Sequence, residues 1–140
     1  MNSKLNSKFV NMEIDNKLEG AYKSYHKNGQ LEQDGNYKND KKEGLWKIYK
    51  NNGQLEQEVN WKEDKQNGVT KFYNINGQIE IEENLKEGRR DGVLKWYYKN
   101  GKLSREGSYK DDKKDGVFKY YHENGKLEKE ISYKDGDIVL

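Results

Sequence analysis

The chain has 140 residues, of which 37% are charged and 31% hydrophobic, and it contains no cysteine and no proline. This length fits one domain. Because eleven Tyr, three Trp and three Phe supply most of the large apolar surface, any core must be aromatic and thin, which disfavours a large enzyme. The lack of cysteine excludes disulfides and thiolate nucleophiles, and a net charge of +2 with both signs interspersed argues against nucleic acid as a partner.

Two features bear on localisation. No apolar stretch approaches the roughly 18 residues of a membrane helix, and the first residues lack the apolar run of a secretion signal. We therefore expect the chain as given to be soluble and cytoplasmic, or exported if a signal peptide precedes it. The compartment itself stays open.

Residues 1–19 precede the regular part of the sequence. Val10, Met12 and Ile14 alternate with other residues, as in a half-buried strand. We expect them to form a half-repeat cap strand that closes the first hairpin, with residues 1–8 frayed.

Residues 20–140 repeat with a period of 24 residues and no insertion. Counted from the glycine that opens each unit, position 4 is always Lys, position 6 is always Tyr, and positions 9 and 10 are always Asn-Gly. Position 12 is Leu or Ile, and position 18 is aromatic or Leu. The five predicted repeats span residues 20–43, 44–67, 68–91, 92–115 and 116–140.

Each repeat is predicted to be a β-hairpin, because two runs of aromatic and β-branched residues flank an Asn-Gly turn. A helix is disfavoured, since each interior Gly costs about 1 kcal/mol and the apolar positions alternate by two. Strands are expected near positions 2–7 and 11–19. The predicted fold is all-β: an elongated, single-layer antiparallel array of stacked β-hairpins.

Two registers are compatible with such a hairpin. A two-residue Asn-Gly turn sets position 4 opposite position 15 and creates five Lys–acid pairs, each worth ~0.2–1 kcal/mol. A three-residue loop with Gly in the left-handed conformation places positions 2, 6, 12 and 18 on one apolar face. We favour the second register, because burying such side chains stabilises by roughly 1.5–3 kcal/mol each.

The opposite face carries apolar residues whose identity varies between repeats, and we expect carboxylates along its edge. This face either packs as a second face of the sheet or binds a partner. If it binds, the predicted partner-binding residues are Tyr22, Trp46, Ile48, Phe72, Trp96, Phe118 and Tyr120.

The chain ends on three apolar residues, Ile138, Val139 and Leu140. Such a tail either folds back on the last hairpin or pairs with a strand of another copy. Self-association through terminal strands is therefore one expectation.

The sequence predicts no catalytic residue, no metal site and no cofactor. The two histidines, His26 and His122, occupy the same position four repeats apart, which is roughly 35–40 Å in a stacked array. Ser24 lies two residues before His26, but no motif positions a third group beside them. The abundant carboxylates alternate with Lys, as on a solvated face.

Basic pairs recur in the loops between repeats, as at Lys41-Lys42, Arg89-Arg90 and Lys113-Lys114. Each basic residue could contribute ~1 kcal/mol to contact with an anionic membrane surface. Neighbouring acids largely cancel that field, so an anionic membrane is only a weak expectation.

The last repeat, from Gly116 to Gly136, resembles the bacterial variant of the MORN repeat, the form called MORN_2. The resemblance rests on Gly, aromatic, Tyr, Asn-Gly, Leu and Tyr-Lys-Asp at fixed offsets, and it covers residues 20–140. The third repeat, with Thr70 at position 3 and Leu85 at position 18, departs from it most.

This resemblance implies stacked hairpins and a non-catalytic role. Bacterial proteins of this kind are often labelled YwqK-type antitoxins, the immunity partner of a toxin, and MORN proteins generally are interaction or membrane-associated scaffolds. We therefore expect a protein–protein interaction module with a protein partner, of which a toxin is one form. The alternative is a structural, cell-envelope or lipid-associated accessory repeat protein.

Overall fold

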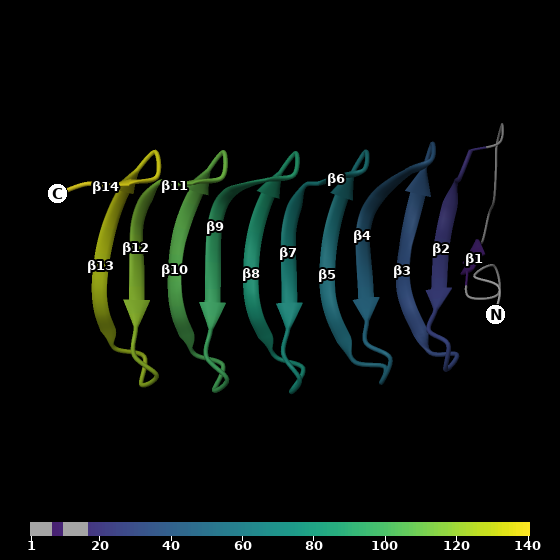
Figure 1. The fold of residues 1–140 in the computed structure, drawn as a ribbon, viewed down its shortest axis with the longest axis horizontal. Helices are drawn as coiled ribbons and strands as arrows, with labels where there is room; N and C mark the ends of the chain where they lie inside the picture. Colours follow the sequence, from purple (N-terminus) through teal and green to yellow (C-terminus); the bar gives the residue numbers. More distant parts are fainter. Residues whose placement is uncertain (1–6, 10–16) are drawn as a thin grey trace.

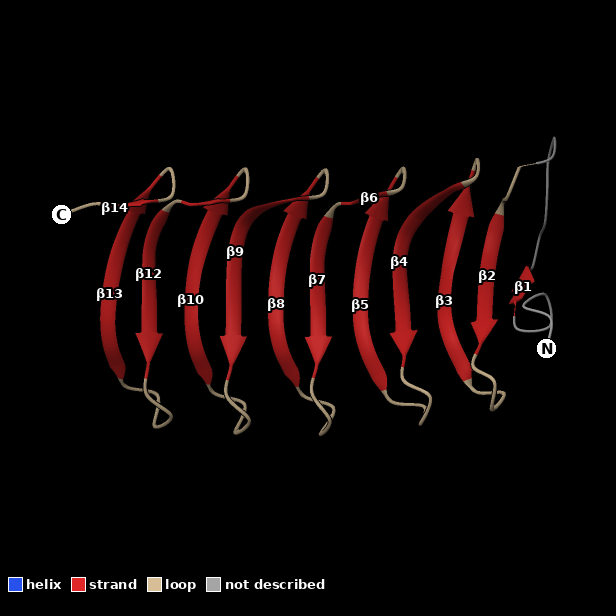
Figure 2. Ribbon diagram, viewed as in Figure 1, coloured by secondary structure: helices blue, strands red, loops and turns tan. Residues whose placement is uncertain are grey.

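The computed structural model describes residues 7–9 and 17–140, and the regular structure in these ranges is all β. Its long strands lie side by side in one antiparallel sheet, in chain order (Figures 1 and 2). The predicted all-β array of hairpins is confirmed. Nowhere in these ranges is there a helix long and apolar enough to cross a membrane.

The strand bounds recur with the 24-residue period. In each repeat a six- or nine-residue strand is followed by an eight-residue strand that begins two residues after the Asn-Gly loop. The strands are β1 (Ser7–Phe9), β2 (Gly20–Tyr25), β3 (Leu31–Lys38), β4 (Lys41–Tyr49), β5 (Leu55–Lys62), β6 (Lys65–Gln66), β7 (Gly68–Tyr73), β8 (Ile79–Lys86), β9 (Arg89–Tyr97), β10 (Leu103–Lys110), β11 (Lys113–Lys114), β12 (Gly116–Tyr121), β13 (Leu127–Lys134) and β14 (Asp137–Ile138).

Two kinds of turn alternate along the array. At the Asn-Gly loops, Gly29 has a φ of 88° and the N–H of His26 donates to the carbonyl of Gln30 at 2.8 Å, so three residues close the hairpin as predicted. The turns between repeats are tighter. Asn39 and Asp40 there have φ values of 50° and 67°, the two left-handed residues of a type I′ turn.

The Asn-Gly loop does not set the register of the whole hairpin, because a β-bulge follows it. Next to the loop Tyr25 pairs with Leu31, as a three-residue loop requires, but beyond the bulge Lys23 pairs with Asp34. The other four hairpins show the same shift. The favoured register is therefore wrong over most of the strand, where the charge-paired register holds.

The bulge divides the predicted apolar stripe between two faces. The face that carries positions 2, 4, 6, 12, 15 and 17 is here named the ladder face, and the face that carries positions 3, 5, 14, 16 and 18 is named the packing face. Position 18 therefore no longer shares a face with position 2. As a consequence Leu45, Val93 and Val117 remain 42–45% exposed on the ladder face.

The core lies on the packing face, as the packing alternative for the variable face predicts. All the largest fully buried side chains occupy positions 3 and 16, where neighbouring repeats meet. They are Trp46, Val59, Thr70, Leu94 and Phe118.

Large side chains of this core are matched by small ones in the preceding repeat. A Cβ added at Gly35 would lie 2.0 Å from Cδ2 of Trp46, and one added at Gly107 would lie 2.5 Å from the ring of Phe118. Where position 3 is the small Thr70, the preceding repeat carries Val59 at position 16. Size complementarity thus fills the core at these three interfaces, whereas two large side chains, Glu83 and Leu94, meet at the fourth.

The N-terminal end of the sheet differs in detail from the expectation, whereas the C-terminal end follows one of its two alternatives. At the N-terminal end the backbone of β1 pairs with β2, so residues 7 and 8 are strand rather than frayed. The predicted cap residues Val10, Met12 and Ile14 lie outside the described residues. At the C-terminal end β14 folds back on β13, and the N–H of Val139 donates to the carbonyl of Ser132 at 2.8 Å.

Candidate functional site

The residues predicted to bind a partner all lie on the packing face, at repeat positions 3 and 5. They differ in exposure. Trp46 and Phe118 are each only 1% exposed, whereas the remaining five are half-buried. These half-buried residues are Tyr22, Ile48, Phe72, Trp96 and Tyr120.

Cations, rather than the expected carboxylates, cover much of this face. The guanidinium of Arg105 lies 3.8 Å from the ring centroid of Trp96, and the ammonium of Lys129 lies 5.0 Å from that of Tyr120. The ammonium of Lys42 lies over two rings, those of Trp46 and Trp61, at 4.8 and 4.7 Å. Such cation–π contacts are worth about 0.5–1 kcal/mol when exposed.

The register explains this correction. The favoured register places positions 13, 15 and 17 beside the aromatic residues, whereas the observed one places position 14 there, with Arg105 and Lys129. Of positions 13, 15 and 17, only position 13, the bulge residue, reaches the packing face, as Glu32 does. The sequence holds the signal, since positions 14 and 5 share a face in the charge-paired register.

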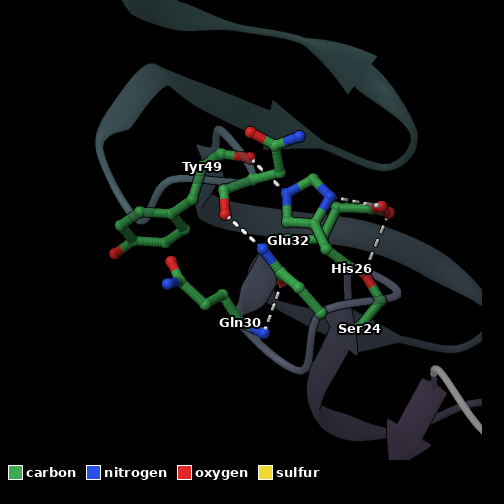
Figure 3. Close-up of polar contacts among 7 residues, drawn as sticks. Ser24, His26, Gln30, Glu32 and Tyr49 are labelled. Atoms are coloured by element: carbon green, nitrogen blue, oxygen red, sulfur yellow. Dashed lines mark hydrogen bonds and ion pairs between the residues drawn. The ribbon is translucent and has the colours of Figure 1, made fainter.

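Ser24, His26 and Glu32 come together at the first Asn-Gly loop (Figure 3). The hydroxyl of Ser24 donates to one carboxylate oxygen of Glu32 at 3.4 Å, and Nδ1 of His26 lies 3.5 Å from the other. Nε2 of His26 is 2.8 Å from the carbonyl oxygen of Tyr49, which makes it the donor. The imidazole thus joins two repeats and does not activate the serine hydroxyl.

The ladder face carries the residues that do not change between repeats. Along it, from the second repeat on, Lys at position 4 stands opposite an acid of its own hairpin and opposite an acid of the preceding one, as Lys47 does with Glu58 and Asp34. In the last three repeats the Tyr hydroxyl at position 6 donates to the acid of the preceding repeat. Tyr73 does so to Glu58, and Tyr121 does so to Glu106 at 3.1 Å.

Burial, and to a smaller extent the hydrogen bond to Glu58, raises the pKa of Tyr73 to about 12. Because the folded state holds this proton more tightly than the unfolded state, Tyr73 stabilises the fold fully below pH 10. That contribution is lost as the pH rises through about 12. We expect the free energy of unfolding of the native chain, relative to Tyr73→Phe, to fall over this window by on the order of 1 kcal/mol, after allowance for solvent screening.

Urea unfolding of both proteins across this alkaline range measures the difference. The Phe variant removes the titrating hydroxyl and keeps the ring, so the other tyrosines cancel in the comparison. A difference that stays constant with pH would show that the Tyr73 hydroxyl is not held in the folded state.

Groups of three or more His, Cys, Asp or Glu side chains arranged to hold a metal ion do not occur in the described part of the chain. The geometry instead defines a solenoid-like class of protein, a linear array of β-hairpins with one packed and one charged face.

A MORN repeat variant family model matches residues 18–39, 42–63, 90–111 and 114–135, which together are more than half of the chain. The chain therefore belongs to the MORN repeat variant family, whose repeats are non-catalytic protein- or membrane-interaction modules. The match omits the third hairpin, the repeat that departs most from the pattern. A search of curated proteins finds no match.

Proposed function

We propose that the protein is a protein-binding module that contacts its partner through the half-buried residues of the packing face. The observation that carries the proposal is the row formed by Phe72, Trp96 and Tyr120 at position 5 of three consecutive repeats. A cation lies over two of these rings, Arg105 over Trp96 and Lys129 over Tyr120.

Aromatic and arginine side chains dominate the energetics of protein interfaces, because they offer large, rigid contact areas with a polar tip. The strands β7, β9 and β12 each hold one ring of the row, so little conformational entropy is lost when a partner binds. Trp46 and Phe118 act only indirectly in this arrangement. They are buried, and their rings pack against tyrosines at positions 3 and 18, namely Tyr22 and Tyr37 for Trp46, and Tyr109 and Tyr133 for Phe118.

We further propose that the partner is a toxin and that the chain is its immunity protein. The support for this step is the resemblance of the repeat to those of YwqK-type antitoxins. Coexpression tests this step directly. If the partner captured by the cross-linking described below is a toxin, its expression alone should arrest growth, and coexpression of the chain should relieve that arrest.

Site-specific cross-linking provides the first test. A photoreactive phenylalanine analogue at position 96 is expected to cross-link one polypeptide, whereas the same analogue at Val93, on the ladder face of the same strand, is not. The cross-linked protein is then purified for titration against the chain. We expect Trp96→Ala to weaken its binding by at least about 10-fold, which corresponds to 1.4 kcal/mol.

The control variant for the titration is Val93→Ala, which removes apolar surface from the ladder face. Equal cross-linking from positions 96 and 93, or unchanged affinity of Trp96→Ala, would contradict a binding role for the packing face.

A further inference from the structure

Like charges face each other across the type I′ turns of four consecutive hairpins. Position 19 is Lys in every repeat, and position 22 is basic in the first four. The strand register sets them directly opposite each other, and all of these residues are exposed. The pairs, here named basic rungs, are Lys38 with Lys41, Lys62 with Lys65, Lys86 with Arg89, and Lys110 with Lys113.

Like charges directly opposite each other in a sheet are destabilising, so the rungs oppose folding. Protection of a sheet edge explains them only in part. Lys65 and Lys113 lie on β6 and β11, which each pair with one strand, but the other six residues lie on strands that pair on both sides. The fifth hairpin shows that the fold permits an alternative. There Asp137 stands opposite Lys134.

Three of the acids near the rungs accept hydrogen bonds from the backbone. Oδ1 of Asp64 accepts a hydrogen bond from the N–H of Lys42 at 2.6 Å, and Oδ1 of Asp112 accepts one from the N–H of Arg90 at 2.7 Å. Oε2 of Glu43 likewise accepts one from the N–H of Glu63 at 3.1 Å. Across residues 17–140, none of the eight rung side chains forms an ion pair.

The first three rungs border two neighbouring hollows at the I′ turns. Lys38, Lys41 and Lys62 line one hollow together with Glu43 and Glu63. Lys62, Lys65 and Lys86 line the next together with Glu63 and Glu87, so Lys62 is shared between them. A carboxylate in either hollow would meet cations from two adjacent repeats. Three lysines and two glutamates line each hollow, so each hollow has one cation in excess and offers a site for one further anionic side chain.

The spacing of the rungs matches an extended polypeptide. Successive rungs are two strands apart, about 9.6 Å, and a polyproline II helix rises about 9.3 Å in each three-residue turn. Like charges within an acidic segment repel one another and extend the segment. If it adopts the polyproline II conformation and carries an acid at every third residue, it presents one carboxylate to each rung. We propose that the basic rungs bind an extended acidic segment of a partner polypeptide.

This proposal shares with the proposed function only the premise that the partner is a protein. The rungs lie on the ladder face, because position 19 has the parity of positions 15 and 17, and the aromatic row lies on the packing face. The two surfaces can therefore be tested separately.

The experiment titrates fluorescent peptides against the full chain at low and physiological ionic strength. One peptide has four Glu-Pro-Pro units, and its control has the same composition with the glutamates consecutive. We expect the spaced peptide to bind more tightly, and its affinity to fall as salt is added.

The variant Lys62→Gln/Lys65→Gln removes one rung, and Lys27→Gln/Lys99→Gln removes the same charge from exposed positions at the Asn-Gly edge. We expect the first to weaken binding about 3- to 10-fold and the second to have little effect. The first variant should also be at least as stable as the native chain, since it relieves repulsion, so unfolding does not explain its weaker binding.

Three outcomes would overturn the proposal. They are equal binding of the two peptides, equal loss in the two variants, and tighter binding of anionic vesicles or single-stranded DNA than of the spaced peptide. None of them bears on the cross-linking from position 96, so the aromatic interface would stand or fall on its own data.

Discussion

Gly35→Ala is expected to destabilise the protein by about 1–3 kcal/mol, or more. The added methyl group would lie 2.0 Å from Cδ2 and 2.2 Å from Cε2 of Trp46. The indole cannot move away, because it is 1% exposed and packs between the rings of Tyr22 and Tyr37, at centroid distances of 5.6 and 5.1 Å. The cost is steric rather than conformational, since Gly35 has no positive φ.

Urea unfolding followed by circular dichroism measures this loss, and the chain supplies its own rescue. The double variant Gly35→Val/Trp46→Thr recreates the pair that Val59 and Thr70 form in the next interface. Its destabilisation should be smaller than the sum of those of the two single variants. Additive losses would mean that size matching between repeats does not set the packing.

Trp46→Ala should destabilise the protein by about 3–5 kcal/mol, the range for removing a buried aromatic side chain. The indole fills the space above Gly35, and its Nε1–H donates to the carbonyl of Asn36 at 3.1 Å. Its loss also removes a ring that Lys42 covers. Because each repeat contacts only its neighbours, hydrogen exchange should rise first in β3 to β5.

Trp96→Ala is the matched control for this prediction. The same side chain is half-buried there, at position 5, and its exposed face is covered by Arg105. We expect a clearly smaller loss of stability than for Trp46→Ala. Equal losses would contradict the distinction between the buried position 3 and the half-buried position 5.

The repeat pattern alone predicts the fold and its turns. A fixed period, the Asn-Gly loops and the alternation of apolar residues suffice for an antiparallel array, and the left-handed glycine of the loop follows from turn chemistry. Those signals are local, so they survive in a single sequence. The location of the core on the variable face is also within reach, since the sequence presents packing there as one of two alternatives.

The register and the cations over the aromatic rings could not be predicted with the same certainty. A β-bulge adds one residue at position 13, where Glu32 and its counterparts look like ordinary solvated strand residues. Hydrophobic burial favours the register of the three-residue loop, and charge pairing favours the register of the two-residue turn. The bulge allows the hairpin to keep the three-residue loop and still form the Lys–acid pairs. That compromise depends on contacts between repeats, such as Trp46 over Gly35, which no local pattern reveals.

The matching of large and small residues also protects the protein from misfolding. A chain with a uniform repeat can slip by one whole unit, and the Asn-Gly loops and the Lys–acid pairs would be equally satisfied in the slipped state. The variable positions are not. With β3 against β7, Gly35 would meet Thr70 and leave a void, and with β5 against β9, Val59 would meet the larger Leu94 in place of Thr70 and clash. The irregular face thus encodes the order of the repeats, which the invariant face cannot.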